Sequence, residues 1–418
     1  MEQKLHLMKS GILAASLFTL AAVICTSCSN SAPQAASGNG TPLNITYISS
    51  LTGPAASQFA NSQQGCLARV DLQNAEGGIN GRKINLSVVD DQTNPTLTAT
   101  AVQSAISNGA LGIVANSPFF FEGAKYAQQA GVPVTGNSSD GPEWGEQPYT
   151  NMFDAFRGSE DPKVPVNSIY GDFLKAHGGT TIGSYGYGVS PLSAEEAKGA
   201  AVSFQQAGGK VGVLDTSVPF GGVDFTSQAL VAGQKHVDAL LPTLDDSSNF
   251  ALVTALKQAG VKLKAVLFSV GYEPSVIHSP VWPSLQGTYF LSLARPFSLP
   301  NAATRQMAAA LTKYAHFTKS EFPSYGQDLA WLGCDLMIKG IHGNGQNPSR
   351  VGVVKALRSI KSYNGNGLLP IDINFSTVFG HDLPQCAWVL KAEKSGFVPI
   401  SSKPTCGTDY AGTTEVSP

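Results

Sequence analysis

The sequence predicts an α/β protein built from two doubly wound lobes, each a parallel sheet with helices on both faces. Short apolar segments alternate with helical patterns along most of the chain, and strands separated by helices of about 10–15 residues form βαβ units with a parallel sheet. The 44 glycines and 25 prolines provide turns between short elements. At about 150 residues per domain, 418 residues fit two lobes better than one sheet.

The first elements follow this alternation closely. Residues 44–50 (NITYISS) form a β-rich segment that ends in a turn at Gly53 and Pro54. Residues 57–76 are expected to form one helix, since apolar side chains recur on one side and Gly77 follows its end. Further strands are expected at 83–91, 110–116, 132–137, 181–188, 210–216 and 264–270, helices at 96–107, 121–131, 193–209 and 327–341, and a hairpin at 387–401.

The N-terminus has the pattern of a secretory signal. Lys4 and Lys9 precede an apolar segment at 11–25, which is short for a permanent membrane helix. Small residues then lead to Cys28, similar to the bacterial lipoprotein signal in which that cysteine is lipidated; ordinary secretion is the alternative. We therefore expect a signal peptide at 1–27 and a flexible tether at 28–42. The body would be extracytoplasmic, anchored to the cell membrane by lipid.

Composition and motifs favour binding over catalysis. With 27 basic and 29 acidic residues the net charge is −2, which argues against a nucleic-acid partner. The seven histidines form no HExxH pair, and phosphate-binding and nucleophile-elbow motifs are absent from the sequence. We expect no enzyme activity, no cofactor and no metal. The adjacent acids are expected to be solvated: Asp90-Asp91, Glu195-Glu196 and Asp245-Asp246.

Four cysteines remain once Cys28 is set aside: Cys66, Cys334, Cys386 and Cys406. An even number suits disulfides in an oxidising compartment. Three pairings are possible, and spacing alone does not choose between them.

Several segments, in order, carry a resemblance to a known family. They are SLTGPAA at 50–56, NAEGGINGRKINLSVVDDQTNP at 74–95, AGVPVTGNSSD at 130–140, NMFDAFRGSE at 151–160, VDFTSQALVAGQKHVDAL at 223–240 and GLLPIDINFS at 367–376. Over residues 43–402 the chain resembles type I periplasmic solute-binding proteins of the branched-chain amino acid (leucine-binding-like) ABC transporter group.

The resemblance implies two Rossmann-like lobes joined by a three-segment hinge. The N-terminal lobe would contain 43–156 and 293–350, and the C-terminal lobe 157–292 and 351–418. The implied function is capture of a small polar solute, an amino acid or a related amide or acid, for delivery to an ABC transporter permease by a monomer. The alternative is a receptor-like binding protein that senses a neutral or aromatic solute without transport; such a receptor is expected to have its own membrane or signalling segment.

The resemblance also orders the cysteines, because it places Cys66 and Cys334 in the same lobe. Cys386 and Cys406 flank the predicted hairpin and can lie opposite each other. We predict the disulfides Cys66–Cys334 and Cys386–Cys406.

Candidate ligand contacts lie in the loops after strands, where open α/β sheets bind ligands. Serines in these loops either hold an anion or cap the next helix. Aromatic residues either stack on the ligand or pack in the core. Glu273 is either a partner for a ligand cation or a solvated acid. The candidates are Ser117, Phe119, Ser138, Ser139, Tyr185, Tyr187, Tyr272 and Glu273.

Overall fold

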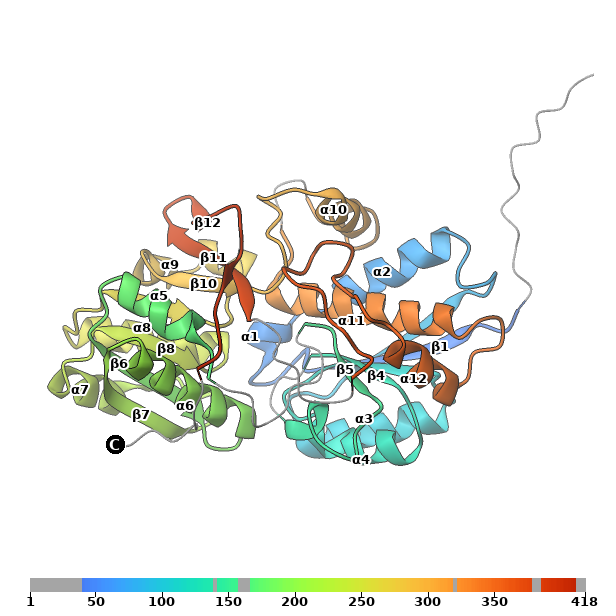
Figure 1. Ribbon diagram of the computed structural model, residues 1–418, viewed down its shortest axis with the longest axis horizontal. Coiled ribbons are helices and arrows are strands. Elements are labelled where there is room, and N and C mark those ends of the chain that lie inside the picture. The colour runs from blue at the N-terminus through green and yellow to red at the C-terminus, as the bar shows by residue number, and fades with distance from the viewer. Residues whose placement is uncertain (1–39, 138–140, 157–165, 319–321, 378–384, 411–418) are drawn as a thin grey trace, which may run out of the picture. The chain divides into compact units, whose positions relative to one another are not determined.

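The computed structural model describes residues 40–137, 141–156, 166–318, 322–377 and 385–410 (Figure 1). Within them, one sheet has five parallel strands in the order β2-β1-β3-β4-β5. The strands are β1 (Leu43–Ser49), β2 (Ile84–Asp90), β3 (Gly112–Asn116), β4 (Val134–Gly136) and β5 (Met152–Asp154).

Helices cover both faces of this sheet because side chains along its strands alternate between two hydrophobic clusters. In β1, Ile45 and Tyr47 enter the cluster with helices α2 and α11, whereas Ile48 enters the cluster with α3 and α4. The helices are α1 (Ala56–Phe59), α2 (Gln63–Ala75), α3 (Pro95–Ser107), α4 (Phe121–Gln129), the 3-10 turn η1 (Pro142–Trp144), α10 (Ala302–Tyr314), α11 (Tyr325–Gly343) and α12 (Arg350–Arg358).

The second sheet has the order β12-β11-β10-β9-β8-β6-β7 in the described residues, and β13 pairs with β11. Strands β7, β6, β8, β9 and β10 are parallel, and β11 joins them antiparallel. The elements are α5 (Ser168–Ala176), β6 (Thr181–Tyr187), α6 (Pro191–Gln206), β7 (Lys210–Val218), α7 (Thr226–Gln234), β8 (Ala239–Thr243), α8 (Asp246–Gln258), β9 (Ala265–Phe268), η2 (Pro274–His278), α9 (Trp282–Leu285), β10 (Tyr289–Ser292), β11 (Cys386–Glu393), β12 (Gly396–Pro399) and β13 (Thr405–Cys406).

The α/β class, the alternation and the C-terminal hairpin are confirmed, but the first predicted helix is in fact two. The break between α1 and α2 contains Asn61, whose φ of 62° is left-handed and ends a right-handed helix. The chain passes between the sheets three times: after β5, after β10 and before β11. In the described residues no helix is both long and apolar enough to cross a bilayer.

One predicted boundary needs correction. The prediction placed residues 351–418 in the second lobe, but residues 353–375 pack with the helices of the first sheet. Val353 and Leu357 of α12 are fully buried there, and a side chain at Gly340 of α11 would collide with Leu357. The apolar face of α12 therefore packs on α11, and the third passage of the chain between the sheets comes later than predicted. The remaining lobe boundaries stay a prediction.

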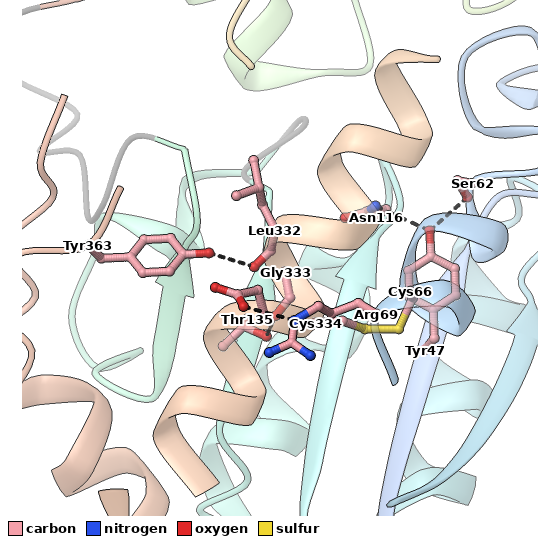
Figure 2. The surroundings of a disulfide bond; sticks show 11 residues. Tyr47, Ser62, Cys66, Arg69, Asn116, Thr135, Leu332, Gly333, Cys334 and Tyr363 are labelled. Carbon is pink, nitrogen blue, oxygen red and sulfur yellow. Dashed lines mark hydrogen bonds and ion pairs between the residues drawn. A yellow bond between two sulfur atoms is a disulfide. The ribbon is translucent and has the colours of Figure 1, made fainter. Parts of the chain in front are cut away.

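Both predicted disulfides, Cys66–Cys334 and Cys386–Cys406, are confirmed. Figure 2 shows the first, which joins α2 to α11 in the interior. Close by, Thr135 donates to the carbonyl of Gly333 at 2.7 Å and Tyr363 donates to that of Leu332 at 2.9 Å. Cross-link and hydrogen bonds together hold α11 against β4 and α2. These contacts therefore also fix the position of the N-terminus of α11.

Candidate functional site

One cavity of about 60 Å³ is bordered by loops at the carboxyl ends of strands from both sheets. In the first sheet these loops follow β1, β3 and β4; in the second they follow β7, β8 and β9, and Tyr187 at the end of β6 joins them. Helices α1, α6 and α11 complete the wall. The lining residues are Ala55, Gln58, Phe59, Pro118, Asn137, Tyr187, Ser193, Glu196, Phe220, Thr243, Leu244, Asp245, Ser269, Val270 and Tyr325.

Asp245 is an acid of this wall whose carboxylate accepts several hydrogen bonds. It is the N-cap of α8, and its carboxylate accepts from the Ser248 amide at 3.1 Å and the Ser248 hydroxyl at 2.9 Å. Ser57 donates to it from the first sheet's side at 3.2 Å. The Tyr187 hydroxyl donates to its other oxygen. These donors explain how the carboxylate is accommodated at 3% exposure.

Tyr187 connects this acid to an aromatic wall. Burial and the charge of Asp245 raise the pKa of its hydroxyl, so Tyr187 stays a donor. Its ring lies 4.6 Å from that of Phe220, which in turn lies 5.4 Å from Phe119. Phe119, from the loop after β3, therefore contacts the lining residue Phe220.

The N-terminus of α11 is placed at the cavity by a capping box. The backbone amide of Gln327 donates to the Ser324 hydroxyl at 3.2 Å, and the backbone amide of Ser324 donates to the side-chain oxygen of Gln327 at 2.8 Å. A further bond from Gln327 to Gln64 at 2.7 Å ties the cap to α2. These contacts position Tyr325, the first residue of α11, in the wall.

A buried hydroxyl network supports the first sheet beneath the cavity. Tyr47 donates to Ser62 at 2.7 Å, and its hydroxyl lies 3.2 Å from the Asn116 amide (Figure 2). Ser49 donates to the Asn116 carbonyl at 2.9 Å. Burial raises the pKa of Tyr47 to about 12. The network remains neutral near pH 7, so it orients α1, α2 and β3 without adding charge.

Of the predicted ligand residues that the structure describes, Tyr187 lines this cavity. Ser117 is buried, and its hydroxyl accepts from the Phe119 amide at 3.2 Å, closing the turn after β3. Tyr185 lies in the core with no partner for its hydroxyl. Ser138 and Ser139 lie outside the described residues. The ligand contacts predicted for all of these residues remain predictions.

Tyr272 and Glu273 lie beside the cavity. The Tyr272 ring stacks on Phe322 at 4.7 Å with an interplanar angle of 13°. Glu273 accepts the Tyr325 amide at 3.0 Å and is 8% exposed. Glu273 is thus a buried acid, and the alternative of a solvated loop acid is wrong.

The expectation that the adjacent acid pairs are solvated is wrong for Asp91, Asp245 and Asp246, which are at most 3% exposed. Asp91 accepts from Ser50 at 2.6 Å and from Thr98 at 3.0 Å. Asp91 and Asp245 lie just after a strand and before a helix, where amide and hydroxyl donors replace water, whereas Asp246 is buried without such a donor among the described residues. Asp245 was not predicted as a site residue, although a strand followed by Asp-Asp-Ser-Ser is a helix-start signal.

Comparison with known proteins identifies a family that the chain matches. A family model described as periplasmic binding protein matches residues 42–396. The Leu/Ile/Val-binding protein homolog 4 of Brucella abortus is 35% identical over 101 residues, 24% of this chain and 24% of that relative. The match thus spans about a quarter of that relative's length.

Two solved structures share the fold at low sequence identity. A branched-chain amino acid ABC transporter protein from Thermus thermophilus with bound valine has a TM-score of 0.73 at 15% identity, covering 89% of this chain and 97% of that one. A solute-binding protein of an ABC transporter from R. palustris, in complex with benzoate, has a TM-score of 0.71 at 15% identity, covering 89% and 98%.

Proposed function

We infer the function from the family, since the chain belongs to the periplasmic binding proteins. We propose that it is the solute-binding component of an ABC importer. The observation that carries the proposal is a cavity at which strand ends of both sheets meet, in a chain that matches the family over residues 42–396. Open α/β sheets bind ligands at such strand ends. The valine and benzoate complexes of the structural neighbours support a small organic solute.

The chemistry of the wall supports a polar ligand with an amino group. Two lining residues are acids, Asp245 and Glu196, and several others offer hydroxyl or amide groups. Among the lining residues that the structure describes, none is Lys, Arg or His. A carboxylate partner without a base favours an ammonium over a simple anion, because attraction between opposite charges strengthens away from water. An amino acid or a related amide fits this pattern.

Solute entry requires the wall to open. The cavity of about 60 Å³ is far below the roughly 300–1,000 Å³ of ordinary ligand pockets. We propose that the two lobes, 43–156 with 293–377 and 166–292 with 385–410, separate by hinge motion at the three passages. The Ser57–Asp245 hydrogen bond, at 3.2 Å, would open and leave Asp245 for the solute. Tyr187 and Phe119 would cover its apolar part.

We further propose that the mature chain is held outside the cytoplasm by lipid on Cys28 and delivers its solute to a membrane permease as a monomer. The support is the N-terminal sequence pattern together with the family.

Thermal-shift screening of the purified protein against amino acids, amides and aromatic acids tests the function. A solute at 100 times its Kd should raise the unfolding free energy by about 2.7 kcal/mol. Isothermal titration should then give one site per chain. A protein that binds none of these solutes, in both assays, would refute the proposal.

A further inference from the structure

Three acidic side chains are buried next to the cavity, and the wall contacts described above do not use them to hold a solute. Asp246 is the first residue of α8, Glu273 lies in the loop after β9, and Asp328 lies in the first turn of α11. Their exposures are 2%, 8% and 7%. Three separate elements thus contribute one buried carboxyl each.

The lining residues place this acid cluster (Asp246, Glu273 and Asp328) against the cavity. Asp246 directly follows Asp245, which lines the cavity. Glu273 accepts the amide of Tyr325, another lining residue, at 3.0 Å. Asp328 lies one turn further along the same helix. Tyr272, the residue before Glu273, stacks on Phe322, so the segment that carries Glu273 is packed against the segment that leads into α11.

Among the described residues, the oxygens of Asp246 have no hydrogen-bond partner. Both are fully buried and unpaired, although buried carboxylates are normally paired with donors or cations. Burial raises the pKa of Asp246, of Glu273 and of Asp328, and the charges of Asp246 and Asp328 further raise that of Glu273. These charge effects agree with the placement of the three acids around the Glu273–Tyr325 contact. The cluster lacks positive charge.

In the described part of the chain, no side chain supplies a positive charge to the acid cluster. None of its ion pairs includes a member of the acid cluster. Nor do its His, Cys, Asp and Glu side chains form any group of three or more that could hold a metal ion. The described carboxyls thus form no metal-binding group, and an organic cation is the ligand class that can neutralise them.

We propose that the solute carries two positive groups, of which one meets Asp245 and the other meets the acid cluster. The ligand class is a small aliphatic dication, such as a diamine or a basic amino acid. This inference rests on the proposed solute-binding function and narrows its ligand class. Opening of the wall would separate Tyr325 from Glu273 and Ser57 from Asp245, and closure on a dication would neutralise the acids.

Isothermal titration of the purified protein with putrescine, L-lysine, L-leucine and benzoate tests the inference. At least one of the two dication-bearing probes should bind about 10-fold or more tightly than leucine and benzoate. Glu273→Gln and Asp246→Asn should each weaken that probe by about 30-fold or more, the loss expected when a desolvated charge pair loses one member. The control Glu195→Gln, an acid with a half-exposed side chain paired with Lys198, should leave its affinity unchanged.

The possible failures are distinguishable. Because the acids repel one another in the empty protein, the two variants should unfold at the same or a higher temperature than the parent; a folded variant with parental affinity for the dication overturns the inference. Tighter binding of leucine or benzoate overturns it too but leaves the proposed function intact. If no solute in the wider screen binds, the proposed function fails and the inference fails with it.

Discussion

Removal of the Cys66–Cys334 disulfide should destabilise the protein more than removal of Cys386–Cys406. The first closes a loop with a sequence separation of 268 residues and the second one of 20. Because a cross-link restricts the unfolded chain in proportion to the logarithm of loop length, the chain-entropy relation gives about 5–6 kcal/mol for the first and about 3 kcal/mol for the second. Both cysteines of the first pair are fully buried, so Cys→Ala also leaves small cavities there.

The measurement is urea unfolding of two double variants, Cys66→Ala/Cys334→Ala and Cys386→Ala/Cys406→Ala, followed by fluorescence and circular dichroism. The difference in unfolding free energy between the double variants should be about 2 kcal/mol or more, with the lower value in the variant without the long loop. Mild reduction is an independent check. Cys406 is exposed whereas Cys66 and Cys334 are buried, so dithiothreitol should open Cys386–Cys406 first.

Equal or reversed stabilities of the two double variants would refute this reasoning, and the stabilisation would then come from local packing rather than from loop closure. Two or more reactive thiols in the oxidised mature protein would refute the pairing itself.

Three further predictions concern the anchor, the cavity wall and a buried acid. Cys28→Ala should move the folded protein from the membrane fraction to the soluble fraction or leave it unprocessed; unchanged partitioning contradicts lipidation. Tyr187→Phe should lower the unfolding free energy by about 1–3 kcal/mol, since Asp245 loses a donor, whereas the control Tyr185→Phe removes an unpartnered hydroxyl and should not; equal losses in urea titration contradict this. Burial raises the pKa of Glu143 from 4.5 to about 8, so the folded state keeps its proton while the unfolded state ionises. Stability should therefore fall between about pH 4.5 and 8, by up to about 5 kcal/mol; Glu143→Gln should remove this part of the pH dependence, and identical pH profiles would contradict it.

The regular elements were predictable because they depend on local patterns. Strands such as 110–116 and helices such as 193–209 follow from apolar period and from breakers at their ends, and both appear in the structure. The break at Asn61 was missed because the side chains of residues 57–76 keep one apolar side on both parts of the interrupted helix. Only the backbone shows the left-handed residue between them.

The candidate site was predictable at the level of loops. Parallel strands bring their carboxyl ends to one edge, and residues at the ends of β3, β4, β6 and β9, near the candidates, line the cavity; that the candidates contact a ligand stays a prediction. Which side chain in a loop lines the wall depends on contacts with distant elements. Asp245 is in the wall because Tyr187 and Ser57 meet it there.

The sequence by itself determined the α/β alternation, the class of the protein and, with the family resemblance, the disulfide pairing. These follow from periodicity, from turn residues and from segments along the chain that resemble a known family. The tertiary structure alone decided that residues 353–375 pack on the first sheet, that Glu273 accepts the Tyr325 amide, and that Asp246 is buried without a donor. The physical reason is that burial and pairing of a charged group depend on what other elements bring to it, and neighbours separated by tens of residues leave no periodic signal.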